Sequence, residues 1–296
     1  SSELLQDVPM KGVDFFADLP TGFSIFPVGK QGTTSLSVLQ KLGGVGGVLT
    51  GKKVVLSLSP SFFQEEVVNP KYFEGNSSKL QAKEFLCSDG YSEDLRRASA
   101  KQMLAYPKVY EGDWMLGFAL RRLAGGTWWD KALLKVMKPY AWIDRAVGRM
   151  QDHVEATEDL LEAAASERQK KQDATGVVKK RMKLNWQELF VAAERSSKEM
   201  ARRSRLRPLK VVRKVGEWDD VFVGKLRKAQ EWKDFELVLR LLREAGAQPL
   251  VISMPMHADV LEAEGVSKNA WVEYGRKLRE LTAAYGAPSI YFEEHE

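Results

Sequence analysis

The chain has 296 residues, of which 44% are hydrophobic and 29% charged, a composition typical of a globular protein with a full core. It contains no run of about 18 apolar residues, which excludes a membrane-spanning helix within this sequence. A single cysteine, Cys87, excludes an internal disulfide. Three scattered histidines without an HExxH motif give no basis for a zinc site, so we expect no bound metal.

The sequence opens on Ser-Ser-Glu-Leu, with no strand in front of it. Two serines followed by a glutamate are commonest as a helix cap. A serine at a tight strand-to-helix turn can instead be a nucleophile, provided that a base takes its proton and N–H groups hold the oxyanion. These residues alone leave both interpretations open.

Four apolar runs predict β-strands, and three of them end in or begin with proline: Gly22–Gly29, Lys52–Pro60, Gln248–Pro255 and Pro288–Phe292. Helical patterns separate them. One begins at a threonine cap in 33–44, one covers 231–246 with Phe235, Val238, Leu239 and Leu242 on its apolar face, and one runs from Ser267 to Gly286. Alternating strands and helices of these lengths predict an open α/β domain over residues 1–296, with a mostly parallel sheet and helices on both faces.

The middle of the chain, residues 69–215, carries almost no strand signal and is predicted to be a large helical insertion in this domain. It contains an aromatic cluster, here Trp128, Trp129, Tyr140 and Trp142. The favoured interpretation of this cluster is core packing between helices. The alternative is a surface that faces a membrane or an apolar partner, where amphipathic rings are enriched.

Charge is unevenly distributed along the sequence. Residues 168–214 hold 16 Lys/Arg and 4 Asp/Glu, a local net charge of +12, and the rest of the chain is net −7. This asymmetry indicates either an anionic partner, such as a phosphate polymer or an acidic carrier protein, or a solvated helical face. Nucleic acid is the least favoured partner, because no known binding motif accompanies the basic segment.

Polar residues follow two of the predicted strands. The stretch 28–36, Val-Gly-Lys-Gln-Gly-Thr-Thr-Ser-Leu, leads through Gly32 into a helix, and Ser61 follows the strand that ends at Pro60. The carboxyl ends of parallel strands form the edge where open α/β proteins place their sites. We therefore expect the Gly32 N–H and Ser61 to lie in the same crevice as Ser2.

This ordered set of motifs resembles the DltD family, the D-alanyl transfer proteins of teichoic-acid D-alanylation, which are related to SGNH/GDSL hydrolases. The resemblance rests on Ser-Ser-Glu, the Gly-x-x-Gly-Thr-Thr turn, Ser-Pro-Ser-Phe-Phe and the C-terminal stretch Trp232–Gly286. It covers about the first 65 and the last 65 residues. The fold it implies is an SGNH-hydrolase-like three-layer sandwich.

The resemblance also implies roles for individual residues. Ser2 corresponds to the nucleophile and Gly32 to the oxyanion-hole glycine. Ser61 occupies the third block, a further oxyanion position where relatives often have Asn or Gln. Ser1 and His257 correspond to positions that line the substrate site. The family's catalytic Asp and His follow the final strand, beyond Glu296, so His295 is not expected to be the base and the chain is expected to be truncated at both ends of its active site.

The function implied is serine-dependent acyl transfer or (thio)ester hydrolysis in the cell envelope, with D-alanyl groups passing to teichoic acid or a related anionic polymer. No cofactor is implied. The expected partners are a membrane O-acyltransferase or an acyl carrier protein, and the expected location is extracytoplasmic, with an N-terminal anchor outside this sequence. The alternative is a non-catalytic protein that docks the membrane O-acyltransferase or presents the polymer.

Overall fold

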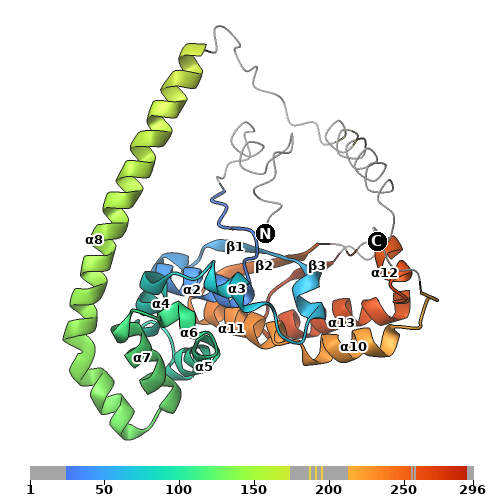
Figure 1. Ribbon diagram of the computed structural model, residues 1–296, viewed down its shortest axis with the longest axis horizontal. Coiled ribbons are helices and arrows are strands. Elements are labelled where there is room, and N and C mark those ends of the chain that lie inside the picture. Colours follow the sequence, from blue (N-terminus) through green and yellow to red (C-terminus); the bar gives the residue numbers. More distant parts are fainter. Residues whose placement is uncertain are drawn as a thin grey trace.

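The computed structural model describes residues 25–173, 187, 191, 195, 213–254, 256 and 258–291 (Figure 1). Its longer helices and its strands follow the chain in this order: α2 (Ser35–Val45), β1 (Lys53–Leu58), α4 (Lys79–Leu86), α5 (Glu93–Leu104), α7 (Trp114–Gly125), α8 (Trp128–Asp173), α10 (Asp219–Lys228), α11 (Glu231–Glu244), β2 (Gln248–Ser253), α13 (Lys268–Ala284) and β3 (Ser289–Tyr291). Short helices lie between them: η2 (Gly46–Leu49), η3 (Pro60–Gln64), α3 (Pro70–Glu74), α6 (Pro107–Tyr110) and α12 (Ala258–Ala263).

The described strands form one three-stranded sheet in the order β1-β2-β3, and both pairings are parallel. Lys53 pairs with Gln248 at one end of the β1–β2 ladder, and Leu58 pairs with Ser253 at the other. The predicted strands at 52–60, 248–255 and 288–292 are therefore confirmed, as is the α/β class with a parallel sheet. Because the strands are parallel, β1 and β2 deliver the residues that follow them to the same edge.

One face of the sheet packs on helices, as Figure 1 shows for α11 and α13. On this face the Ser253 hydroxyl lies 2.9 Å from the Tyr274 hydroxyl, and the Tyr274 ring contacts Tyr291 edge-on. On the opposite face, Val55 is 59% and Ile290 42% exposed. The described helices therefore cover the sheet mainly from one side.

Helix α11 forms because its apolar residues recur every three to four positions, and Phe235, Val238, Leu239 and Leu242 are all buried. The chain leaves this helix through Gly246, whose φ of +65° strains any other residue. The strand β2 follows directly. The prediction of a helix at 231–246 is thus confirmed.

The predicted strand at 22–29 is not confirmed, because its described part, residues 25–29, has no strand conformation. Phe26 is 87% exposed in this segment. The adjacent Pro27 lacks the N–H that a sheet ladder needs, which explains why an apolar run alone does not make a strand here.

Between residues 69 and 173 every regular element is a helix, from α3 to α8, with short turns between them. Helices α4, α5 and α7 share one hydrophobic core with α2 and α11. The outer limits assigned to the insertion, 69 and 215, stay a prediction. Among the described residues, no helix is both long and apolar enough to cross a membrane.

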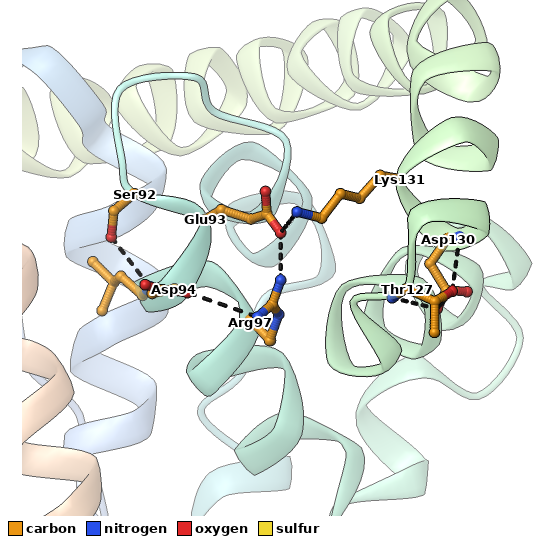
Figure 2. Close-up of polar contacts among 8 residues, drawn as sticks. Ser92, Glu93, Asp94, Arg97, Thr127, Asp130 and Lys131 are labelled. Carbon is orange, nitrogen blue, oxygen red and sulfur yellow. Dashed lines mark hydrogen bonds and ion pairs between the residues drawn. The ribbon is translucent and has the colours of Figure 1, made fainter.

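Helix α8 begins at a reciprocal cap that fixes it to the helices beside it. The Thr127 N–H and hydroxyl donate to the Asp130 carboxylate at 3.1 and 2.7 Å, and the Asp130 N–H donates back to the Thr127 hydroxyl (Figure 2). These hydrogen bonds and Arg122 hold the pKa of Asp130 below its usual range. Lys131 adds an ion pair of 2.9 Å to Glu93, at the start of α5.

The interpretation of the aromatic cluster as core packing is wrong. Trp128, Trp129, Tyr140 and Trp142 lie on α8 with 62–65% of each side chain exposed. The physical reason is that α8 turns other residues toward the body of the protein, among them Asp130 and Ala141. The cluster is a surface feature, as its alternative interpretation required.

Candidate functional site at the carboxyl edge of the sheet

The candidate site begins where β1 and β2 end side by side. The chain leaves β1 through Ser59 into the helix η3, and it leaves β2 at Ser253. The Met254 N–H donates to the Leu58 carbonyl at 3.0 Å, which continues the ladder by one residue. Both loops therefore emerge at one edge of the sheet, as the sequence predicted.

Ser61 lies in the first turn of η3 and is exposed. Its hydroxyl is 2.9 Å from the hydroxyl of Ser59. Proline at the preceding position, Pro60, starts this turn because its fixed φ suits the first helical residue. The Ser61 hydroxyl is thus held at the strand end and remains accessible from outside.

Gly32 lies in a tight turn just before α2. Its φ is +73°, and a Cβ at this position would lie 2.5 Å from Cδ1 of Tyr72. The Thr33 N–H closes the turn on the Lys30 carbonyl at 3.1 Å, and Thr34 caps α2 by accepting from the Ser37 N–H. Glycine is therefore required at position 32 for two reasons, the backbone conformation and the close approach of the tyrosine.

Tyr72 connects the Gly32 turn to the Ser61 turn. Its ring packs against Gly32 and meets the ring of Phe62 edge-on, with centroids 5.6 Å apart. Asn76 further ties the turn to the end of α3 by donating to the Gln31 carbonyl at 3.1 Å. Two aromatic rings, Tyr72 and Phe62, therefore link the turn of Gly32 to the helix η3 that carries Ser61, and the oxyanion roles of both residues stay predictions.

The backbone N–H of Gly32 has no hydrogen-bond acceptor among the described residues. An N–H in a glycine turn that no described residue accepts is a donor suited to a small anion or to a developing oxyanion. The turn lies at the amino end of α2, whose dipole favours negative charge there. This part of the edge can therefore bind negative charge.

Two buried carboxylates, Glu231 and Asp234, lie near the amino end of α2. They were not predicted from the sequence. Glu231 is 3% exposed and accepts a hydrogen bond from the Ser35 N–H at 2.7 Å. Burial raises its pKa to about 6, although the Ser35 bond opposes this shift. Burial and the nearby charge of Glu231 raise the pKa of Asp234 to about 7.

One of these carboxylates supports the helix that follows the Gly32 turn. The Ser35 N–H is one of the donors that the first turn of α2 cannot satisfy internally, and Glu231 supplies the acceptor. A sequence signal existed, because Glu231 and Asp234 precede Phe235 and Val238 by four residues and so lie on the apolar face of α11. An acidic residue on a buried face needs a partner, and here the partner is the helix that follows Gly32.

Other predicted site residues lie outside the described residues: Ser1, Ser2, His257 and His295. The basic segment 168–214 does so for most of its length. His153, the remaining histidine, is exposed on α8. No group of His, Cys, Asp or Glu in the described part of the chain could hold a metal ion.

A separate cavity of about 320 Å³ lies between α4, α7 and α8, away from the sheet edge. Its walls are mostly apolar, with Arg96, Lys138 and Arg145 among the lining residues. It contains none of the predicted site residues. The sheet edge with Ser61, together with the Gly32 turn joined to it through Tyr72, remains the candidate site.

Fold and site together define an α/β protein with a parallel sheet and a tight glycine turn that is joined through Tyr72 to the helix following β1. Comparison with known proteins specifies the family. The family model described as "DltD protein" matches residues 1–296, so the chain belongs to the DltD family. This confirms the family resemblance that the sequence motifs indicated.

Two curated relatives carry the same name. The chain is 25% identical over 305 aligned positions to Protein DltD of Bacillus subtilis (strain 168), an alignment that covers 100% of this chain and 74% of that protein. It is also 25% identical over 119 positions to Protein DltD of Staphylococcus aureus (strain NCTC 8325 / PS 47), covering 40% of this chain and 30% of that protein.

Proposed function

We propose that this protein acts in the cell envelope as a serine-dependent acyltransferase or esterase in the D-alanylation of teichoic acid or a related anionic polymer. The observation that carries the proposal is the Gly32 turn, which Tyr72 and Phe62 join to the helix that follows β1, in a chain that matches the DltD family over residues 1–296.

In the proposed reaction, the Ser2 hydroxyl attacks the carbonyl carbon of an activated acyl donor, most simply a D-alanyl ester or thioester. An Asp/His pair outside residues 1–296 takes the serine proton, and the carbonyl oxygen becomes an oxyanion. The leaving group departs with a proton, which leaves an acyl ester on Ser2. A hydroxyl of the polymer, or water, then attacks this ester and releases Ser2.

The role proposed for Gly32 is to donate its N–H to the oxyanion. Three observations support this role: the Gly32 N–H has no acceptor among the described residues, its turn has a positive φ, and the amino end of α2 is adjacent. Ser61 is proposed as a second donor through its exposed hydroxyl. A donor of this kind typically lowers the barrier by about 3 kcal/mol, which corresponds to a rate factor of about 100.

The setting we propose is the extracytoplasmic side of the membrane, with an anchor at the amino end of the whole protein. The net charge of +12 in residues 168–214 supports a role for that segment in contacting a phosphate polymer or an acidic acyl carrier protein. A membrane O-acyltransferase is the other proposed partner. Binding that weakens steeply with added salt would support the electrostatic part of this proposal.

The test is to react the full-length protein with a fluorophosphonate probe and to read the intact mass. We expect one adduct, its loss in Ser2→Ala and its retention in Ser1→Ala. Gly32→Ala keeps the backbone N–H but adds a Cβ that collides with Tyr72, so it should displace the N–H from the oxyanion and slow labelling of the folded protein by about 100-fold. A folded full-length protein that never labels would contradict the catalytic proposal.

A second candidate function is a non-catalytic docking protein for a membrane O-acyltransferase. The exposure of Trp128, Trp129, Tyr140 and Trp142 on α8 favours it, because such a surface suits an apolar partner. This candidate predicts no labelling by the probe. It also predicts that Trp128→Ala and Trp142→Ala release the acyltransferase in a pull-down, whereas Ser2→Ala does not.

A further inference from the structure

Helix α8 presents an apolar seam that nothing in the described part of the chain covers. From Trp129 onward, apolar residues follow at alternating intervals of four and three residues. Nine of them are 42–70% exposed: Trp129, Leu133, Val136, Tyr140, Ile143, Val147, Met150, Val154 and Leu161. The tenth position of the repeat is Thr157, which is also exposed.

The seam is separate from the face that packs on the body. The residues turned toward the body follow a seam residue by one or two positions, as Asp144 and Arg145 follow Ile143. One residue corresponds to a rotation of about 100° around the helix. The packing of α8 on α4 and α7 therefore leaves the whole seam open.

Beyond Arg149 the helix leaves the body. Arg149 still donates to Glu84 at 2.6 Å, but every residue from Gln151 to Glu158 is exposed. Figure 1 shows this half of α8 extending away from the other described helices. Helices in proteins gain most of their stability from the packing of an apolar face, so an exposed seam along this half of α8 indicates that another helix packs on it.

The spacing of the seam identifies the kind of partner. Apolar residues at intervals of four and three give a period of 3.5 residues, which drifts by about 20° per heptad on a straight helix. Two helices that supercoil around each other correct this drift, and a flat membrane surface does not. The seam is therefore suited to a second long helix.

Among the described helices, only α8 is long enough to match this seam. The seam from Trp129 to Leu161 extends for about 50 Å at 1.5 Å per residue along a helix that contains Pro139, and its part beyond this proline, from Tyr140 to Leu161, extends for about 32 Å. The next longest described helix, α13, has 17 residues and already packs in the core. A partner helix of equal length with a complementary seam is the α8 of a second copy.

We propose that this protein forms a homodimer in which the α8 helices of two copies pair along this seam as a two-stranded coiled coil. Nine exposed apolar side chains bury on the order of 800 Å² on each copy, which is the area per partner of a standard stable interface. A two-fold pair is also the commonest closed assembly, because it satisfies the same surface on both copies. The dimer is independent of the function proposed for the sheet edge.

The test compares the full chain with two single variants of α8. Val154→Glu places a charge in the seam, and Ala156→Glu places the same charge on the opposite side of the helix, two residues away. Both positions lie beyond the contacts with the body, so neither change disturbs the fold. Sedimentation is measured from about 1 to about 100 μM, and circular dichroism checks that the helical content and the melting curve are retained.

We expect the unsubstituted chain and Ala156→Glu to sediment as dimers, and Val154→Glu to dissociate with a Kd at least about tenfold higher. A monomer at all concentrations overturns the proposal, as does a dimer that Val154→Glu and Ala156→Glu weaken equally. Vesicles of phosphatidylglycerol and phosphatidylcholine are added in parallel. A monomer that binds them through the seam would assign this surface to the membrane instead.

Discussion

The carboxylate of Glu231 accepts a hydrogen bond from the backbone N–H of Ser35 at 2.7 Å, across 196 residues of sequence. Ser35 opens the helix α2, three residues after Gly32. Glu231 opens α11, the central helix beneath the sheet. This one bond therefore fixes the candidate oxyanion turn to the most deeply buried helix of the domain.

Replacing Glu231 by alanine should lower the free energy of unfolding by about 1–3 kcal/mol, because the buried Ser35 N–H loses its acceptor. The measurement is urea denaturation at neutral pH. Glu262→Ala is the control, since Glu262 is exposed on α12 and should change stability by less than about 0.5 kcal/mol. Equal losses for the two variants would show that the Ser35 contact contributes nothing measurable.

The buried pair should make stability decrease with rising pH. The pKa values of Glu231 and Asp234 are raised to about 6 and about 7. The folded protein therefore binds more protons than the unfolded chain between about pH 4 and pH 7. The contribution of the pair is fully present below about pH 4 and is lost as the pH rises through 6 to 7.

The change attributable to Asp234 is on the order of 3 kcal/mol, and Asp234→Asn should flatten this part of the profile. Asp259→Asn, on the exposed face of α12, should leave the profile unchanged. Carboxylates with a lowered pKa, such as Glu93 beside Lys131, change stability over a lower pH range, because their stabilising contribution is lost only in acid. Denaturant midpoints measured every half unit of pH distinguish the two pH ranges. A stability profile of the unsubstituted protein that is flat between pH 5 and 8 would contradict this prediction.

Gly32→Ala should destabilise the protein by about 1–3 kcal/mol, because the new methyl group meets Tyr72 in a backbone conformation that alanine avoids. Gly47→Ala is the matched control, since a Cβ there meets nothing within 4 Å. The double variant Gly32→Ala/Tyr72→Ala separates the two causes. Relative to Tyr72→Ala, the double variant should lose only the stability that the positive φ costs, because the ring that the methyl group would meet is gone. The additional loss in Gly32→Ala alone then measures the collision. Thermal melting of the four variants is sufficient to test this.

The strands and the Gly32 turn could be predicted from the sequence because their signals are local. β1 and β2 are short apolar runs closed by Pro60 and Pro255, and a glycine before a threonine cap marks a turn with positive φ. The prediction of a strand at 22–29 was wrong because strand formation is not decided locally. This segment is locally apolar, but whether a run becomes a strand depends on a neighbour to pair with, which the sequence does not reveal.

Long-range features of the site were out of reach of local patterns. Glu231 reads as an ordinary charged residue at a helix start, and only the fold places it against Ser35. The predicted burial of the aromatic residues of α8 was wrong for a related reason. The helix carries two stripes about 100° apart, and the pattern alone does not say which one the body covers. Burial of Ala141 and exposure of Tyr140, its neighbour, show how one residue of rotation decides the outcome.

The position of α8 depends on the buried ammonium group of Lys83. Lys83 of α4 pairs with Asp113 at 3.1 Å and with Asp144 of α8 at 2.5 Å. Burial alone would lower the pKa of Lys83, but its hydrogen bonds with Asp144 and Asp113 outweigh this effect and raise it. Lys83 therefore stays charged and joins α8 to the helices α4 and α7.

Lys83→Met should lower the free energy of unfolding by about 3 kcal/mol, because it keeps the aliphatic stem but leaves two carboxylates without their partner. Lys108→Met removes an exposed lysine whose ion pair with Glu74 is 3.7 Å long, and it should cost less than about 1 kcal/mol. Urea denaturation measures both losses. Hydrogen exchange in residues 141–149 should also rise in Lys83→Met alone, since that part of α8 is held by the pair; unchanged exchange there would show that Lys83 does not hold the helix.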